Sequence, residues 1–403
     1  MTKGETMDIR PDDLFAHIDA DEVVALAGGL AQIPSEIPNE GPIANYLAEE
    51  MRKTGAFDEV HLQDVVPGRP NVIGVVHGSG DGPNLLLNGH LDTGAPAGEW
   101  SRGPYDVYEE DGFLYGFGLT DMKGAVACLV KAAEAVARAD LRPKGDLVVT
   151  AVVHHDVCGL GTKFFLESND RPFAMCINGE PTGLRLQLAH GGAWQFELTT
   201  QGVAEHISRR EGGVDATGKM IKLLDALDER QFTFDPNQAL EGLPRMVVGQ
   251  INGGTAASRT ANRCTARGDV RIVPGMTADT LSADFRRVIA GIAATDPEFR
   301  ADLRTLVYQR PFQIDANAPV VALTSQAHRD VTGEEPESST GLPVCSYVTD
   351  SSDIVRHGIP TVVYGPSNWR MVPDERISIA EMVTATKVYA LAAARVVTGQ
   401  FGE

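Results

Sequence analysis

The sequence lacks several features that mark whole classes of protein. No apolar run approaches the roughly 18 residues that a membrane-spanning helix needs. The opening residues, MTKGETMDIRPDDL, contain no apolar segment of the secretory type. The five cysteines are scattered without a C-x-x-C pair, which predicts a reducing, cytoplasmic location and no disulfide framework. We therefore expect neither a secreted protein nor one embedded in a membrane.

Positive charge is also scarce. The chain has 35 Lys and Arg residues against 55 Asp and Glu residues, a formal net charge of −20. Such a surface repels phosphate backbones, so nucleic acid is excluded as an expected partner. A small anionic substrate is still compatible with this charge, provided that arginines bind it locally.

What the sequence does contain is an alternation of apolar strands and amphipathic helices. Its 403 residues are enough for two domains. Helical spacing and strand-like runs alternate in the first part of the chain, which predicts an α/β layer fold with a largely parallel sheet. The segments are helices over 22–33, 41–56, 121–140 and 160–168, and strands over 59–66, 71–78, 84–92, 145–156 and 173–180.

The pattern changes near residue 188. Four strands and two helices follow in the order β-α-β-β-α-β, the split βαβ sandwich. Helix and strand alternation of the first kind then resumes. We predict a metal-binding catalytic domain formed by residues 1–187 and 305–403, with residues 188–304 inserted as a second domain, because a host domain tolerates an insertion whose two junctions lie close together.

Metal-binding side chains stand at the ends of four segments in the first domain. They are His90 with Asp92, Asp121, His155 with Asp156, and Glu180. Ligands in parallel α/β sheets bind beyond the carboxyl ends of strands. Imidazole and carboxylate groups suit Zn, Mn or Co. One such residue alone has an ordinary explanation, as a helix cap for Asp121, but four such ends together predict a metal site.

The segments GHLDT, GLTDMKGA, GLGT, GEPT and INGGTAA, in this order, resemble the metallopeptidase family that includes aminoacylase, carboxypeptidase G, acetylornithine deacetylase and succinyl-diaminopimelate desuccinylase. The resemblance runs from about residue 20 to the end of the chain and includes the inserted domain. It implies a zinc-peptidase-like three-layer catalytic domain and an inserted lid and dimerisation domain. It also implies a homodimer or higher homo-oligomer, a two-zinc centre, and hydrolysis of an amide bond next to a carboxylate.

The resemblance also implies roles for single residues. His90 corresponds to a terminal ligand of one metal, Asp121 to the carboxylate that bridges two metals, and Glu180 to the second terminal ligand of the first metal. Asp92 corresponds to the acid that fixes the tautomer of His90. The peptide bond from Asp121 to Met122 is implied to be cis.

Three positions depart from the family. His155 and Asp156 stand where the family has a Glu-Glu pair, of which the first is the general base and the second binds the other metal. Met371 stands in place of a histidine ligand of that second metal, and a thioether is a poor ligand for a hard ion. We therefore predict one divalent transition metal per subunit, Mn, Zn or Co, with Asp156 as a shortened candidate ligand. His155 either accepts a proton or binds the metal itself.

The inserted domain supplies the implied substrate contacts. His206 corresponds to a histidine that reaches into the partner subunit's site and polarises the substrate. Arg271 and Arg310 correspond to arginines that grip a substrate carboxylate. Ser258 replaces an asparagine that contacts the substrate in relatives and, with Met371, indicates a changed substrate.

These departures argue against ordinary peptide hydrolysis. The predicted function is cleavage of a C–N bond in a small, non-peptide, carboxylate-bearing substrate. An example is hydrolytic deamination of an aromatic amine to a phenol and ammonia, as in the family's 5-nitroanthranilate aminohydrolase variant. The alternatives are an N-acyl amino acid amidohydrolase with a drifted metal site, and an inactive relative that only binds a ligand. The retained His90, Asp121 and Glu180 argue against the last.

Overall fold

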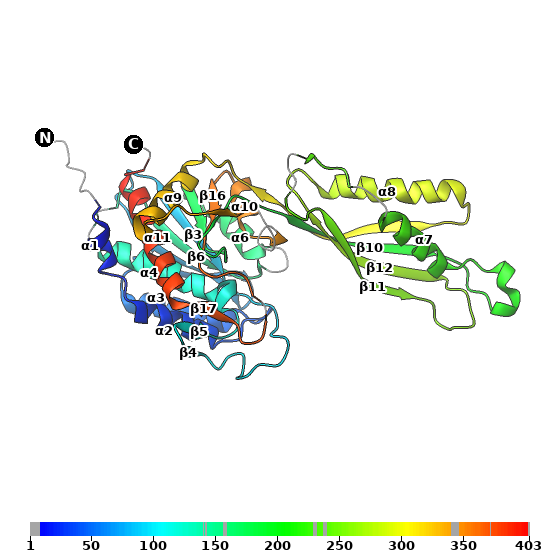
Figure 1. Ribbon diagram of the computed structural model, residues 1–403, viewed down its shortest axis with the longest axis horizontal. Coiled ribbons are helices and arrows are strands. Elements are labelled where there is room, and N and C mark those ends of the chain that lie inside the picture. The colour runs from blue at the N-terminus through cyan, green and yellow to red at the C-terminus, as the bar shows by residue number, and fades with distance from the viewer. Residues whose placement is uncertain are drawn as a thin grey trace. The chain divides into compact units, whose positions relative to one another are not determined.

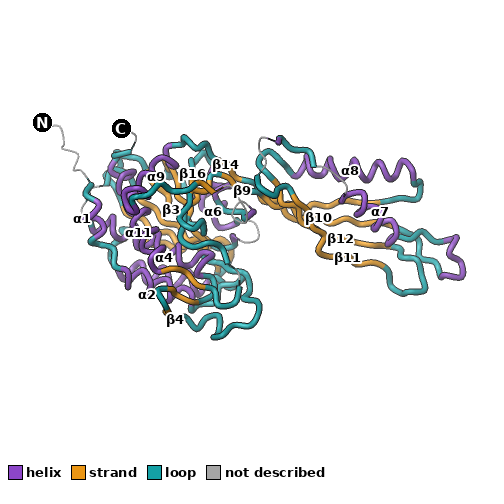
Figure 2. The backbone as a smooth tube through the Cα atoms, viewed as in Figure 1, coloured by secondary structure: helices purple, strands orange, loops and turns teal. Residues whose placement is uncertain are grey.

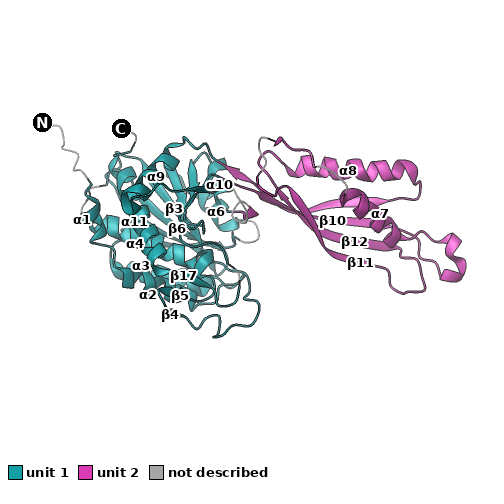
Figure 3. Ribbon diagram, viewed as in Figure 1, with its two compact units in different colours: residues 1–188, 314–339, 349–403 teal, residues 189–313, 340–348 magenta. Residues whose placement is uncertain are grey.

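The computed structural model describes residues 9–139, 141, 143–155, 159–228, 232–236, 240–339, 346–370 and 372–401. The chain forms two compact units (Figure 3). The larger comprises Met1–Leu188, Ile314–Ser339 and Thr349–Glu403, and the smaller comprises Ala189–Gln313 and Thr340–Val348. The boundary expected at residue 304 falls inside strand β13 (Ala301–Gln309). This strand belongs to the smaller unit's sheet, so that segment of the smaller unit ends at Gln313.

The larger unit is built on an eight-stranded sheet. Its order is β1 (Glu59–Val66), β2 (Arg69–Val76), β6 (Leu147–Val152), β3 (Asn84–His90), β7 (Phe173–Asn178), β16 (Thr361–Val363), β8 (Leu186–Gln187) and β15 (Ser338–Ser339). The central strands β6, β3, β7 and β16 are parallel, whereas β1 with β2, β2 with β6, and β16 with β8 are antiparallel. The edge strands β8 and β15 are parallel. The sheet is thus mixed, with the predicted parallel arrangement in its centre and at this edge.

Helices cover both faces of this sheet, because alternate residues of the central strands point to opposite sides. Leu85 and Leu87 join the core beneath one set of helices, and Leu86 joins Phe165 and Ile354 on the other face. The first set is α2 (Ala20–Ala31), α3 (Gly41–Thr54), α4 (Gly124–Arg138), α9 (Pro319–Thr332) and α11 (Ile379–Thr398), and the second is α6 (Leu160–Ser168) and α10 (Ser351–Arg356). This confirms the predicted three-layer catalytic domain (Figure 1).

Several short elements were not predicted. They are α1 (Pro11–Phe15), the three-stranded sheet of β17 (Arg376–Ser378), β5 (Phe113–Tyr115) and β4 (Tyr108–Glu110), and the turn η1 (Leu119–Lys123). Within η1 the bond from Asp121 to Met122 is cis, as the family resemblance implies. None of the helices in the described ranges is long and apolar enough to cross a membrane.

The smaller unit has the predicted β-α-β-β-α-β order (Figure 2). It comprises β10 (Gly192–Gln201), α7 (Ala216–Asp228), β11 (Arg245–Gly253), β12 (Arg263–Ile272), α8 (Ala278–Thr295) and β13, with β9 (Ala189–His190), β14 (Phe312–Gln313) and the turn η2 (Ile207–Gly212). The four-stranded sheet is antiparallel in the order β11-β12-β10-β13. Trp194, Phe196 and Phe285 form its aromatic core, and Thr277 caps α8.

Candidate metal centre

The end of β3 directs His90 into a buried cluster of acids. Its Nδ1 lies 2.9 Å from the main-chain oxygen of Asp92. A carbonyl oxygen only accepts, so Nδ1 carries the proton and Nε2 is left for an ion. Nε2 lies 3.1 Å from Oδ1 of Asp121 and 3.8 Å from Oε1 of Glu180. Asp92 therefore fixes His90 through its main chain, while its carboxylate has another partner.

That partner belongs to the turn after β6, which buried acids hold in place. His154 has φ 61°, and its N–H donates to the carboxylate of Glu40 over 3.2 Å. Glu40 is fully buried and forms two hydrogen bonds with Arg69. The next N–H, that of His155, donates to Oδ1 of Asp92 over 2.9 Å. These contacts fix the direction in which the side chain of His155 leaves the strand.

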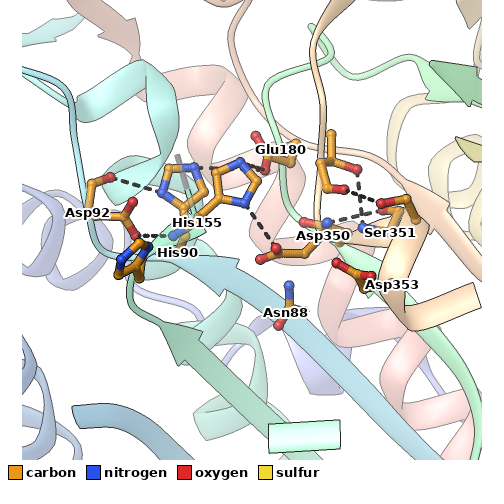
Figure 4. Close-up of polar contacts among 12 residues, drawn as sticks. Asn88, His90, Asp92, His155, Glu180, Asp350, Ser351 and Asp353 are labelled. Carbon is orange, nitrogen blue, oxygen red and sulfur yellow. Dashed lines mark hydrogen bonds and ion pairs between the residues drawn. The ribbon is translucent and has the colours of Figure 1, made fainter. Parts of the chain in front are cut away.

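The side chain of His155 lies face to face with His90, with ring centroids 4.3 Å apart and planes 7° apart. Its Nε2 lies 3.7 Å from Oε1 of Glu180, and its Nδ1 lies 3.0 Å from Oδ1 of Asp350 (Figure 4). Despite this distance, Nδ1 forms no well-aligned hydrogen bond within the described part of the chain. Asp350 could not be predicted from the sequence, because nothing in VTDSSD links it to a histidine in a distant segment.

The spacing of these groups fits a divalent transition metal. Candidate ligand atoms of His90, His155 and Glu180 all lie within 4.8 Å of one another, and all three residues are buried. Ligand atoms around a tetrahedral ion, each about 2.1 Å from it, are about 3.4 Å apart. The distances of 3.1 Å and 3.8 Å from His90 Nε2 to Asp121 and Glu180 bracket that value. Nitrogen and carboxylate donors are also the chemistry that Zn, Mn and Co accept.

The buried groups of this cluster shift one another's pKa values. Burial and His155 lower the pKa of His90, but Glu180 and Asp121 outweigh them and raise it to about 10. Burial lowers the pKa of His155 too, yet Asp350 brings it well above the usual value. Burial raises the pKa of Glu180 to about 8, although both histidines lower it. Burial also acts to raise the pKa of Asp350, but His155 outweighs it and lowers that pKa to about 2. Without an ion the cluster holds protons that a metal would displace.

Asp121 divides its carboxylate between two partners. Oδ1 lies next to His90, and Oδ2 accepts a hydrogen bond of 2.9 Å from the indole Nε1 of Trp369. Beside it, the N–H and hydroxyl of Thr120 donate to Oε1 of Glu375. A bridging carboxylate would present one oxygen to each of two ions, whereas here the second oxygen already has an N–H partner. The sequence reading missed Trp369, which precedes the departure at Met371.

His206 and Ser258, two predicted substrate residues, lie in the smaller unit next to η2. His206 is exposed, and its Nδ1 lies 3.2 Å from the donating N–H of Ser208. Since that nitrogen accepts, the proton of the neutral ring is on Nε2, which can donate outward. Ser258 is exposed as well, and its main-chain oxygen accepts from the N–H of Ile207 over 2.9 Å.

The two predicted arginines also belong to the smaller unit. Nε of Arg271 lies 3.0 Å from Oδ1 of Asp269, and one terminal nitrogen donates to the main-chain oxygen of Ser346 over 3.3 Å. Arg310 is exposed, with its guanidinium 5.6 Å from the ring centre of Tyr308. The remaining predicted site residues, Asp156 and Met371, lie outside the described part of the chain.

Fold and centre together indicate a metal-dependent protein with an α/β catalytic domain, and sequence comparison identifies its family. The chain belongs to the peptidase family M20/M25/M40, whose sequence profile matches residues 86–395. This confirms the resemblance seen in the motifs. The chain is accordingly a metallohydrolase that acts on a carbon–nitrogen bond.

Individual relatives cover nearly the whole chain. An N-formyl-4-amino-5-aminomethyl-2-methylpyrimidine deformylase from Halalkalibacterium halodurans is 27% identical, covering 93% of this chain and 95% of its own. An acetylornithine deacetylase from Erwinia tasmaniensis is 30% identical, covering 84% and 86%.

Solved structures confirm the fold. Aminopeptidase PepT from Bacillus cereus matches 94% of this chain and 99% of its own with a TM-score of 0.76 at 18% identity. A dinuclear metal-binding M20 peptidase from Bacillus subtilis matches 94% and 98% with a TM-score of 0.72 at 14% identity.

Proposed function

We propose that this chain is a single-ion amidohydrolase that removes a short acyl group from the nitrogen of a small, carboxylate-bearing molecule. The observation that carries the proposal is the divided carboxylate of Asp121. Oδ1 contacts His90, whereas Oδ2 accepts a hydrogen bond from the indole of Trp369. Two relatives that match most of the chain are named a deformylase and a deacetylase, which supports a short acyl group.

Three residues would hold the ion. They are His90 through Nε2, Glu180 through a carboxylate oxygen, and Asp121 through Oδ1. A bound divalent ion supplies charge that polarises a carbonyl group and makes water more acidic. The residues around the ligands keep this arrangement fixed, because Asp92 orients His90 and Trp369 orients Asp121.

The other protein groups act on the substrate. His155, buried beside Glu180, would take a proton from the attacking water. His206 of the partner subunit's inserted domain would donate from Nε2 to the oxygen on which charge develops. A substrate carboxylate would bind Arg271 or Arg310. Arg271 already forms an ion pair with Asp269, whereas the guanidinium of Arg310 is exposed beside the ring of Tyr308.

A second candidate function is deamination of an electron-poor aromatic amine. The observation that favours it is His155, an imidazole where the family resemblance implies a carboxylate, since a carbon already activated by its ring needs a less effective base. The product would then be ammonia and a phenol rather than a free acid and an amine.

One substrate panel tests both functions. Protein loaded with Zn, Mn or Co is incubated with N-formyl and N-acetyl amino acids and with aminobenzoates that include 5-nitroanthranilate. We expect formate or acetate release, abolished in Glu180→Gln and unchanged in Glu337→Gln, whose side chain is 76% exposed. Ammonia release without acid release would replace the first function by the second. No turnover of any substrate at full metal content would contradict both.

A further inference from the structure

Glu375 is a buried acid that the proposed reaction does not use. Its side chain is only 2% exposed, and it directly precedes β17. Oε1 accepts hydrogen bonds from the N–H of Thr120 over 2.7 Å and from the hydroxyl of Thr120 over 2.9 Å. Oε2 accepts one from the N–H of Gly118 over 3.2 Å. Three donors at the start of η1 therefore converge on one carboxylate, and hydrogen bonds to a charged acceptor are the strong kind.

The turn that donates these bonds is not fixed by helical geometry. At Asp121, φ is −141° and ψ is 89°, so the main chain leaves the helical conformation at the proposed metal ligand itself. The first N–H groups of a helix have no partners within that helix. In the described part of the chain, those of Gly118 and Thr120 bond to Glu375 instead. The position of Asp121 thus depends on an anchor from outside the turn.

We propose that Glu375 is the positioning residue for Asp121, which it holds toward His90 through the main chain of Thr120. The inference rests on the proposed function, because it takes Asp121 as a ligand of the ion. Oδ1 of Asp121 lies 3.1 Å from Nε2 of His90, and a small displacement of the turn would change that distance. Partners that orient metal ligands typically account for about 10–100-fold in metal affinity.

The anchor is itself held by its neighbours along the chain. The main-chain oxygen of Glu375 accepts from the N–H that follows β5 over 3.1 Å, and the next three residues pair with β5 as β17 (Figure 1). Asp374 accepts from the N–H of Ser101 over 3.0 Å and from its hydroxyl over 2.8 Å. Trp369, a few residues earlier, bonds the side chain of Asp121. Asp121 is thus held twice, through its carboxylate and through the main chain before it.

Asp284 provides a matched control in the smaller unit, which contains none of the proposed metal ligands. It is 1% exposed and accepts hydrogen bonds of 2.9 Å from both the N–H and the hydroxyl of Thr233. Glu375→Gln and Asp284→Asn each replace a buried carboxylate that bonds one threonine twice by a neutral amide. Both substitutions should lower stability, but only the first should alter the metal centre.

Competition of the intact protein against a chromophoric chelator measures the Kd for Zn without a substrate. We expect Glu375→Gln to raise this Kd about tenfold, and Thr120→Val, which removes one of the three donors, to raise it about threefold. Thr120→Ser, which keeps the hydroxyl, and Asp284→Asn should bind Zn as wild type does. An unchanged Kd in folded Glu375→Gln or Thr120→Val protein would overturn the proposal.

The visible absorption spectrum of the Co-loaded protein gives a second readout, which a general loss of stability would not change. The bands of bound Co follow the geometry of its ligands. They should shift in Glu375→Gln and stay as in wild type in Asp284→Asn. Bands in Glu375→Gln identical to those of wild type would overturn the proposal, whereas wild-type protein that binds the ion but turns over no substrate would contradict only the proposed function.

Discussion

The hydrogen bond from Trp369 to Asp121 makes a quantitative prediction about metal affinity. In Trp369→Phe the ring is kept but the N–H that bonds Oδ2 over 2.9 Å is lost. A hydrogen bond to a charged group contributes about 1.5–3 kcal/mol. Loss of a partner that orients a metal ligand typically weakens metal binding about 10–100-fold, which is about 1.4–2.7 kcal/mol. The Kd for Zn should therefore rise by that factor, while the stoichiometry stays at one because phenylalanine offers no ligand.

Competition against a chromophoric chelator measures this Kd directly. The matched control is Trp100→Phe, because the indole of Trp100 donates to the main-chain oxygen of Ala97 and contacts Phe117 instead. The control should bind Zn as wild type does. An unchanged Kd in Trp369→Phe would refute the idea that this indole orients Asp121 as a metal ligand.

Three further predictions follow from buried groups. Zn binding near neutral pH should release more than one proton, because Glu180 and Asp121 raise the pKa of His90 to about 10 and burial raises the pKa of Glu180 to about 8. The apparent affinity should therefore fall as pH falls, and calorimetry in two buffers of different ionisation heat measures the proton release. Glu40→Gln removes the charge of the fully buried carboxylate that pairs with Arg69 and should lower the free energy of unfolding by about 3–5 kcal/mol in urea titration, whereas Glu50→Gln, at a partly exposed pair with Lys53, should leave it unchanged. Thr277→Ala removes the α8 capping box and should cost about 1 kcal/mol, and an unchanged urea midpoint would contradict that role.

Most of the element order could be predicted from the sequence, because it depends on local periodicity. The strand over 59–66 matches β1, and the helix over 160–168 matches α6. Sheet direction could not be predicted with the same success, since a strand's neighbours are chosen by tertiary packing. The antiparallel pairing of β2 with β6 is an example. The short strands β4, β5 and β17 have three residues each, too few for a period-2 pattern.

The candidate site also contains some residues that could be predicted from the sequence and others that could not. His90, His155 and Glu180 end predicted strands, so the sequence could indicate that they meet, and the structure places them in one buried cluster. Asp350 and Trp369 are different, because each acts through a contact between segments that are distant along the chain. Neither stands at the end of a strongly patterned element, and no local signal distinguishes either from an ordinary loop residue.

Anomalous X-ray diffraction at the zinc edge, on crystals grown with Zn in excess, tests the central claim most directly. The account predicts one strong peak per chain, within bonding distance of Nε2 of His90 and of Asp121 and Glu180, with the indole of Trp369 still bonded to Asp121. Two peaks of comparable occupancy on either side of Asp121 would contradict it.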